Sequence, residues 1–176
     1  MGVRELRSRK ISKLGNFQAY IVATDLPDPD DHSPGPSAHA WEIRRVDGDQ
    51  VEDGDAKASD RNDSDENRAY ATGAFRVVEA TPAHSTINIC SPSDYIVRAI
   101  NEWLIMWRAN GWRGSDGKPI AHREWWQRFD AECTKRNLVV TAKRLRSDDW
   151  IGHMICKQLM QGAKKTCAKK KPQRPC

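Results

Sequence analysis

The sequence contains no closely spaced cysteine pair, no long hydrophobic run and no secretory leader. Its 5 cysteines form no Cys-x-x-Cys motif, so neither a disulfide framework nor a zinc site has the spacing that it needs. No apolar segment is long enough to cross a bilayer, and the N-terminus lacks the apolar core of a signal peptide. We therefore expect a reduced, cytoplasmic protein without a membrane partner.

Acidic residues are missing from the end of the chain and scarce at its start. After Asp149 there is no Asp or Glu, whereas Lys and Arg continue to Arg174. Residues 1–15 hold a single acid, Glu5, among several basic residues. Basic ends attract phosphate backbones through counterion release, and they also serve as solvated tails that keep a protein soluble. The sequence leaves both interpretations open.

The length of 176 residues suits one compact domain with tails. We expect a basic N-terminal tail over residues 1–15, a folded domain over residues 16–162 and a basic C-terminal tail over residues 163–176. Residues 47–66 are acidic and nearly devoid of apolar side chains. This composition indicates a mobile loop, with at most a marginal edge strand around Val51.

Hydrophobic periodicity predicts a strand-rich start followed by alternating strands and helices. The predicted strands are 17–23, 39–45, 86–90 and 138–143. The predicted helices are 67–80, 92–110, 125–133 and 151–162. Within the first of these helices, residues 75–78 alone would also suit a strand. The order is typical of an α/β or α+β domain.

The segment from Asp94 to Trp126 combines aromatic and basic residues at helical spacing. It holds five of the 7 tryptophans. Before it, Ser91 is the expected N-cap of a helix, Pro92 its first residue and Asp94 the partner in a capping box. The tryptophan spacing favours helix packing over stacking on bases, while the basic residues around these rings suit a polyanion.

Four stretches in this region closely resemble the bacterial ribonuclease HI family. They are Tyr95-Ile-Val-Arg-Ala-Ile-Asn-Glu-Trp-Leu104, Trp107-Arg-Ala-Asn-Gly-Trp-Arg113, Gly117-Lys-Pro-Ile120 and Trp125-Trp-Gln-Arg-Phe-Asp130. Thr24-Asp25 and Ser33-Pro-Gly-Pro36 also resemble the opening hairpin of that family. The resemblance extends over roughly residues 17–162 and is most specific over 94–130.

The resemblance implies an α/β, ribonuclease H-like fold with a mixed five-stranded sheet flanked by helices. It also implies that an RNA–DNA hybrid is bound across the sheet and that four carboxylates hold two magnesium ions, which cleave the RNA strand. Two neighbouring dications need several negatively charged oxygen ligands to offset their repulsion.

Carried over residue by residue, the resemblance retains the first of these acids as Asp25. The acid of the first helix falls on Tyr70, the acid that opens the central helix falls on Pro92, and the last acid falls near His153. The sequence thus indicates a pseudoenzyme that keeps the fold and has lost most of the metal site. Asp25 is at most a weak metal ligand on this interpretation.

Displaced carboxylates are the alternative. Asp94 lies two residues beyond Pro92, and Asp149 lies just before the final helix. Together with Asp25 they could bind Mg²⁺ or Mn²⁺ and keep hybrid cleavage active. Helix capping is the simpler interpretation of Asp94, and a solvated helix start is the simpler interpretation of Asp149.

Nucleic-acid binding can persist without catalysis. The resemblance places a basic protrusion after the central helix, against the duplex backbone, and further basic groups after the last strand. The residues expected to contact nucleic acid are Arg108, Trp112, Arg113, Lys118, Arg123, Lys143 and Arg144. The leading hypothesis is a catalytically degenerate protein that binds an RNA–DNA hybrid or another duplex. A third hypothesis is a protein-interaction module that docks a partner through the acidic 47–66 segment or the basic C-terminus.

Overall fold

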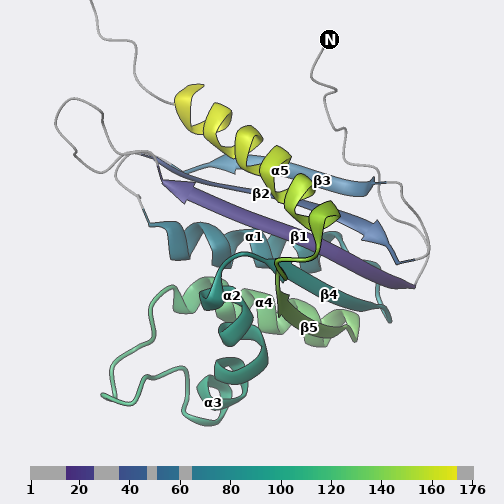
Figure 1. Ribbon diagram of the computed structural model, residues 1–176. Coiled ribbons are helices and arrows are strands. Elements are labelled where there is room, and N and C mark those ends of the chain that lie inside the picture. Colours follow the sequence, from purple (N-terminus) through teal and green to yellow (C-terminus); the bar gives the residue numbers. More distant parts are fainter. Residues whose placement is uncertain (1–14, 26–35, 47–50, 60–64, 170–176) are drawn as a thin grey trace, which may run out of the picture.

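A five-stranded mixed sheet forms the centre of the molecule (Figure 1). The computed structural model describes residues 15–25, 36–46, 51–59 and 65–169. The strands follow the order β3-β2-β1-β4-β5 across the sheet. Their bounds are β1 Asn16–Asp25, β2 Ser37–Arg45, β3 Val51–Ala58, β4 Thr86–Ser91 and β5 Val139–Arg144. The first three strands pair antiparallel, while β4 lies parallel to both β1 and β5. The predicted fold class is confirmed.

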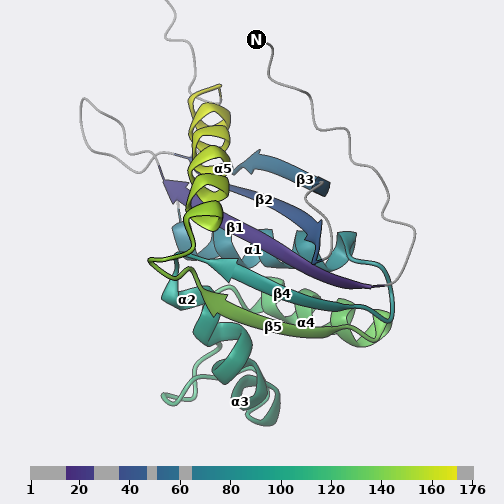
Figure 2. The same cartoon turned by 45° about the vertical axis from the view of Figure 1, so that its right-hand side comes forward.

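Side chains of the sheet alternate between two hydrophobic cores, one on each face. Along β1, Phe17 and Ile21 belong to one core, whereas Tyr20 and Val22 belong to the other, as the two-residue period of a strand requires. Helices α1 (Glu66–Ala80) and α4 (Arg123–Arg136) cover the first core. Helix α5 (Trp150–Lys169) crosses β1, β2 and β3 on the opposite face (Figure 2).

Helix α1 lies directly on the sheet beneath β1 and β2. Asp65 is its N-cap, and the Asp65 carboxylate accepts a hydrogen bond from the backbone N–H of Arg68 at 3.1 Å. A Cβ added at Gly73 would lie 3.1 Å from the Ile21 side chain, so a small residue permits the close approach of helix and sheet. The helix ends at Thr81, directly before Pro82. The predicted helix over 67–80 is confirmed.

The central helix protrudes from the sheet in three consecutive segments. These are α2 (Asp94–Arg98), the π-helical turn η1 (Ala99–Trp103) and α3 (Leu104–Ala109). The predicted start is wrong by two residues: Ser93 is the N-cap and makes no side-chain capping hydrogen bond, while the Ser91 hydroxyl accepts from the Ser93 N–H at 3.2 Å. Beyond α3, Gly111 has a φ of 60° and ends the helical path.

Two predicted boundaries differ from the structure. Residues 51–58, expected to be mostly loop, form the edge strand β3, because its backbone pairs with β2 although few of its side chains are apolar. The sequence predicts that the last helix ends near Gly162, but α5 continues to Lys169. Ala163 and Cys167 of this extension are buried in the core between α5 and the sheet. The remaining parts of the acidic segment and of both basic tails lie outside the described residues.

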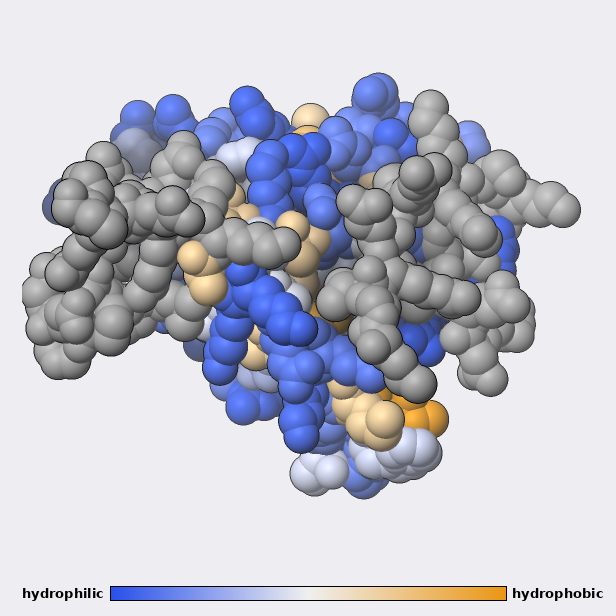
Figure 3. All heavy atoms as spheres, turned by 90° about the horizontal axis from the view of Figure 1, so that it is seen from above, coloured by the Kyte–Doolittle hydropathy of each residue, from blue (hydrophilic) through white to orange (hydrophobic). Residues whose placement is uncertain are grey.

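The face that carries α5 is largely hydrophilic, with small hydrophobic patches (Figure 3). Within the described part of the chain, no helix combines the length and apolarity that a bilayer span requires.

Candidate functional site

Asp25, the last residue of β1, lies beside the acidic start of α1. Partial burial raises the pKa of Glu66, and repulsion from Asp25 and Asp65 raises it further. Asp25 and Asp65 are therefore each close enough to Glu66 to act on its charge. Asp65 also lies 3.2 Å from the Nε2 atom of His122. Glu66 was not among the predicted site residues. Its position directly before Asn67-Arg68 was the only sequence signal for it.

Tyr70 occupies the junction of β1, β4, α1 and α5. Its side chain is only 4% exposed. Burial raises the pKa of the Tyr70 phenol, whereas contacts with the Ala23 backbone and the Ser91 hydroxyl lower it; Cys156 of α5 is another neighbour. The phenol therefore fills the space between the ends of the two central strands. This is the helix position at which the family resemblance called for a carboxylate.

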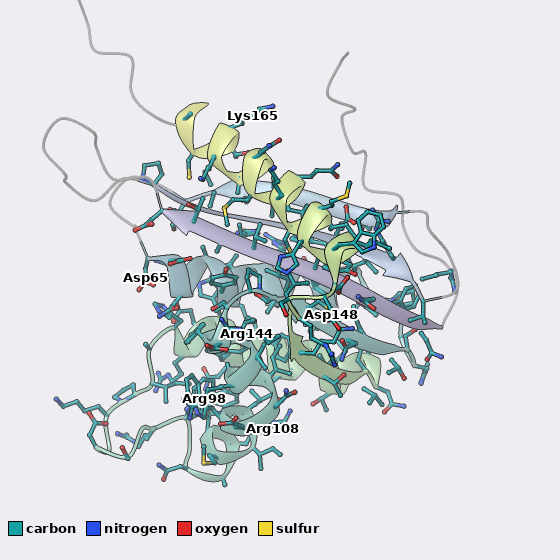
Figure 4. All side chains as sticks on the ribbon, viewed as in Figure 1. Asp65, Arg98, Arg108, Arg144, Asp148 and Lys165 are labelled. Carbon is teal, nitrogen blue, oxygen red and sulfur yellow. The ribbon has the colours of Figure 1, made fainter. Side chains whose placement is uncertain are left out.

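Pro92 follows β4 directly and is exposed. Two residues later, the exposed carboxylate of Asp94 forms an ion pair with the guanidinium of Arg144 at the end of β5. Figure 4 labels Arg144. The strand register explains the contact, because Ser91 and Arg144 are paired residues in β4 and β5. The predicted capping role of Asp94 is therefore wrong, because its carboxylate pairs with Arg144.

Asp149 acts as a cap for the first turn of α5. Its carboxylate accepts a hydrogen bond from the backbone N–H of Gly152 at 2.8 Å. Its neighbour Asp148 is exposed and pairs with Arg146 at 2.9 Å. His153 lies in the first turn of the helix, where a ring nitrogen lies 3.0 Å from the carbonyl oxygen of Arg146. Each of these groups already has a local structural partner.

The described residues do not fit a two-magnesium centre. Among residues 15–25, 36–46, 51–59 and 65–169, no three His, Cys, Asp or Glu side chains gather in a way that could hold a metal ion. Asp25 acts on Glu66, while Asp94 and Asp149 are held by Arg144 and by the α5 backbone. Two close dications require more carboxylate oxygens than this arrangement supplies. The assignment of Asp25 as a lone metal ligand stays a prediction.

The protrusion consists of α3 and the loop that leads to α4. Arg108 is tied to Asp130 of α4 by a hydrogen bond of 2.6 Å from its Nε atom. Arg113 donates to the carbonyl oxygen of Gly117 at 2.7 Å, within a tight turn that pairs Arg113 with Pro119. Lys118 and Arg123 are exposed and have no ion-pair partner among the described residues. They are therefore the cations of the protrusion with the most freedom to meet a phosphate.

Aromatic packing attaches the protrusion to the domain. The Trp107 ring lies 5.7 Å from that of Trp103 and 5.6 Å from that of Trp126, which is fully buried. The Trp126 indole N–H donates to the Tyr95 hydroxyl at 2.9 Å. Trp112 is half-buried at the corner, with a φ of 62°. The structural role expected for Trp107 is confirmed, and the assignment of Trp112 to a nucleic-acid surface stays a prediction.

Lys143 and Arg144 end β5 at the edge of the sheet. Both are exposed. Lys143 lies next to the buried Cys90 thiol, whose pKa burial raises to about 11 while Lys143 lowers it. Arg144 is held by Asp94. The structure therefore places both residues on the surface near the ends of β4 and β5, with one of the two charges already offset.

The sheet order, the helices on its two faces and the protruding central helix define an α/β protein with the ribonuclease H-like fold. The RNase H family profile matches residues 36–143, which is more than half of the chain. A ribonuclease H of Jannaschia sp. (strain CCS1) is 32% identical over 107 residues, covering 61% of this chain and 68% of that protein. The chain belongs to the RNase H family.

A second relative and a solved structure show how far the similarity extends. A ribonuclease H of Paracoccus denitrificans (strain Pd 1222) is 30% identical over 99 residues, covering 56% of this chain and 64% of that protein. A foamy viral protease-reverse transcriptase in complex with an RNA/DNA hybrid superimposes with a TM-score of 0.61 at 17% identity, over 94% of this chain and 22% of that one. The chain spans between about half and two thirds of the length of the curated relatives that it matches.

Proposed function

We propose that this protein is a catalytically degenerate RNase H family member that binds nucleic acid, either an RNA–DNA hybrid or another duplex. The observation that supports the loss of catalysis is the burial of Tyr70 between the ends of β1 and β4. A phenol with a raised pKa is neutral at physiological pH and is a poor ligand for magnesium. A carboxylate would be needed at this point to help hold two ions.

Binding is assigned to the basic protrusion. Lys118 and Arg123 lie exposed on it, whereas Arg108 and Arg113 are held by local contacts and shape the loop. Phosphate contacts depend on released counterions, so affinity should fall steeply as salt rises. A foamy viral protease-reverse transcriptase, which contains the same fold, is in complex with an RNA/DNA hybrid in one structure and with dsDNA in another, which supports a duplex ligand.

Fluorescence anisotropy with a labelled hybrid tests this assignment. The double variant Lys118→Gln and Arg123→Gln should weaken hybrid binding about tenfold or more at low salt and reduce the salt dependence. The control is Lys135→Gln with Lys157→Gln, which removes the same charge from exposed positions on α4 and α5. Equal affinities for both double variants, or no binding by the wild type at low salt, would refute the assignment.

A second candidate function is hybrid cleavage by displaced carboxylates. The neighbouring carboxylates of Asp25 and Glu66 favour it, because two acids can hold a single Mg²⁺ or Mn²⁺ ion. It requires metal-dependent cleavage that Asp25→Asn abolishes. Participation of Asp94 or Asp149 would require each to leave its present partner. A protein partner for the acidic 47–66 segment or the basic C-terminus also stays a prediction.

A further inference from the structure

A pocket of about 300 Å³ lies between α1, the strands β2 and β3 and the start of α4. Its basic lining residues are Lys57, Arg68 and Arg76, and no acidic side chain lines it among the described residues. Thr72 of α1 adds a hydroxyl group, and Trp125 of α4 forms part of the wall. The volume is at the lower end of the range for small-molecule sites.

Two enclosed nitrogen atoms at this pocket have no hydrogen-bond partner among the described residues. They are Nε2 of His39 and Nε1 of Trp125, and both residues line the pocket. His39 is only 4% exposed. A buried donor that stays unsatisfied costs about 1–3 kcal/mol, so such atoms usually bind water or a ligand. The Trp125 indole can only donate, and the imidazole donates through Nε2 in one of its tautomers.

Positive charge and free donors together suit an anion. Lys57 is exposed on the edge strand β3 and has no ion-pair partner among the described residues. Arg76 pairs with Glu79 at 2.6 Å through one nitrogen, which leaves its other donors for a ligand. Charge-assisted hydrogen bonds from such groups are the strong contacts in phosphate recognition.

We propose that this pocket binds a terminal phosphate group, either on a free mononucleotide or at the end of a nucleic-acid strand. A terminal phosphate enters a pocket of this size with one attached sugar, whereas a diester within a strand would bring two. Lys57 and Arg76 bind the phosphate oxygens, and Trp125 in the pocket wall reports the binding. Neither Lys118 nor Arg123 lines the pocket, so the proposal does not depend on the proposed function.

NMR of the seven indole N–H groups provides the test. Inorganic phosphate and adenosine 5′-monophosphate should each cause a saturable shift of the Trp125 signal at constant ionic strength, whereas adenosine should cause none. Trp125→Phe identifies that signal. Lys57→Gln should weaken binding about tenfold or more, whereas Lys135→Gln, an exposed control on α4, should leave it unchanged.

Two matched oligonucleotides distinguish the sources of the phosphate. If a 5′-phosphorylated strand shifts the Trp125 signal and the same strand with a 5′-hydroxyl does not, the pocket accepts strand ends. If only the mononucleotide acts, the pocket binds the free molecule. Equal shifts from both strands, no saturable shift with any phosphate, or equal affinity of the Lys57→Gln and Lys135→Gln variants would overturn the proposal.

Discussion

Asp94 at the start of α2 forms an ion pair with Arg144 at the end of β5. The sequence suggests Asp94 as a replacement for a lost catalytic acid and Arg144 as a contact to nucleic acid. In the structure the two side chains bind each other instead. Both side chains are more than half exposed, so the pair contributes only about 0–1 kcal/mol to stability. Its main effect is to offset a cation near the proposed binding face.

Asp94→Asn should therefore tighten hybrid binding. The change removes a negative charge and releases the Arg144 guanidinium for phosphate, so we expect about a two- to fivefold gain in affinity at low salt. Anisotropy titrations measure it. Glu132→Gln removes the acid that pairs with Arg136 on α4 and is the matched control. A gain of the same size in this control would indicate a general charge effect instead of a local one.

Asp149 and Asp148 are adjacent acids with different structural roles. Asp149→Ala should destabilise the protein by about 1 kcal/mol, because the Gly152 N–H loses its cap. Asp148→Ala should change the free energy of unfolding by less than about 0.5 kcal/mol, since its partner Arg146 is exposed. Urea denaturation compares the two variants. Equal losses would contradict the capping role of Asp149.

His39 makes stability depend on pH. Burial lowers the pKa of His39 to about 4, with Asp55 opposing this shift and Arg76 and Lys57 adding to it. The unfolded chain, with a histidine pKa of about 6.5, then binds more protons than the folded protein between these two values. Stability should be complete above about pH 6.5 and fall by up to roughly 3 kcal/mol as the pH decreases towards 4.

Urea unfolding of the wild type and of His39→Leu, in a buffer without phosphate, measures this term. The variant should have a flatter stability profile between pH 6.5 and pH 4.5. An identical slope in both proteins would show that other groups cause the loss. Chemical-shift titration of the His39 ring gives the same pKa directly.

Tyr70 supports the sheet where a carboxylate was expected. Tyr70→Phe removes the hydroxyl that contacts Ser91 and the Ala23 backbone, so we expect a loss of about 1 kcal/mol. Tyr70→Ala should cost about 3–5 kcal/mol, as for other large aromatic side chains in a core. Chemical denaturation measures both. If Tyr70→Ala left the free energy of unfolding unchanged, the phenol would not fill the junction.

Local patterns were sufficient to predict most of the sheet and its helices. The apolar run of β1 and the helical period of α1 are strong signals, since β1 is buried on both faces and α1 along one face. The extent of β3 is not evident from the sequence, because the strand is held against β2 by backbone pairing and carries few apolar side chains. The site was harder to predict. The neighbours Asp25 and Glu66, and the pair of Asp94 and Arg144, meet through strand register and helix placement, which no short sequence window contains.

The pocket between α1 and β3 had no sequence signal at all. His39, Lys57 and Arg76 come from separate elements, and each residue by itself reads as an ordinary strand or helix position. Only the fold brings them together with Trp125.

The loss of catalysis is tested by incubating a hybrid, labelled on its RNA strand, with saturating protein. A gel shift should show that the hybrid is bound, and the RNA should remain intact in Mg²⁺ and in Mn²⁺, with wild type and Asp25→Asn indistinguishable. Metal-dependent cleavage that is lost in Asp25→Asn would contradict the loss of catalysis.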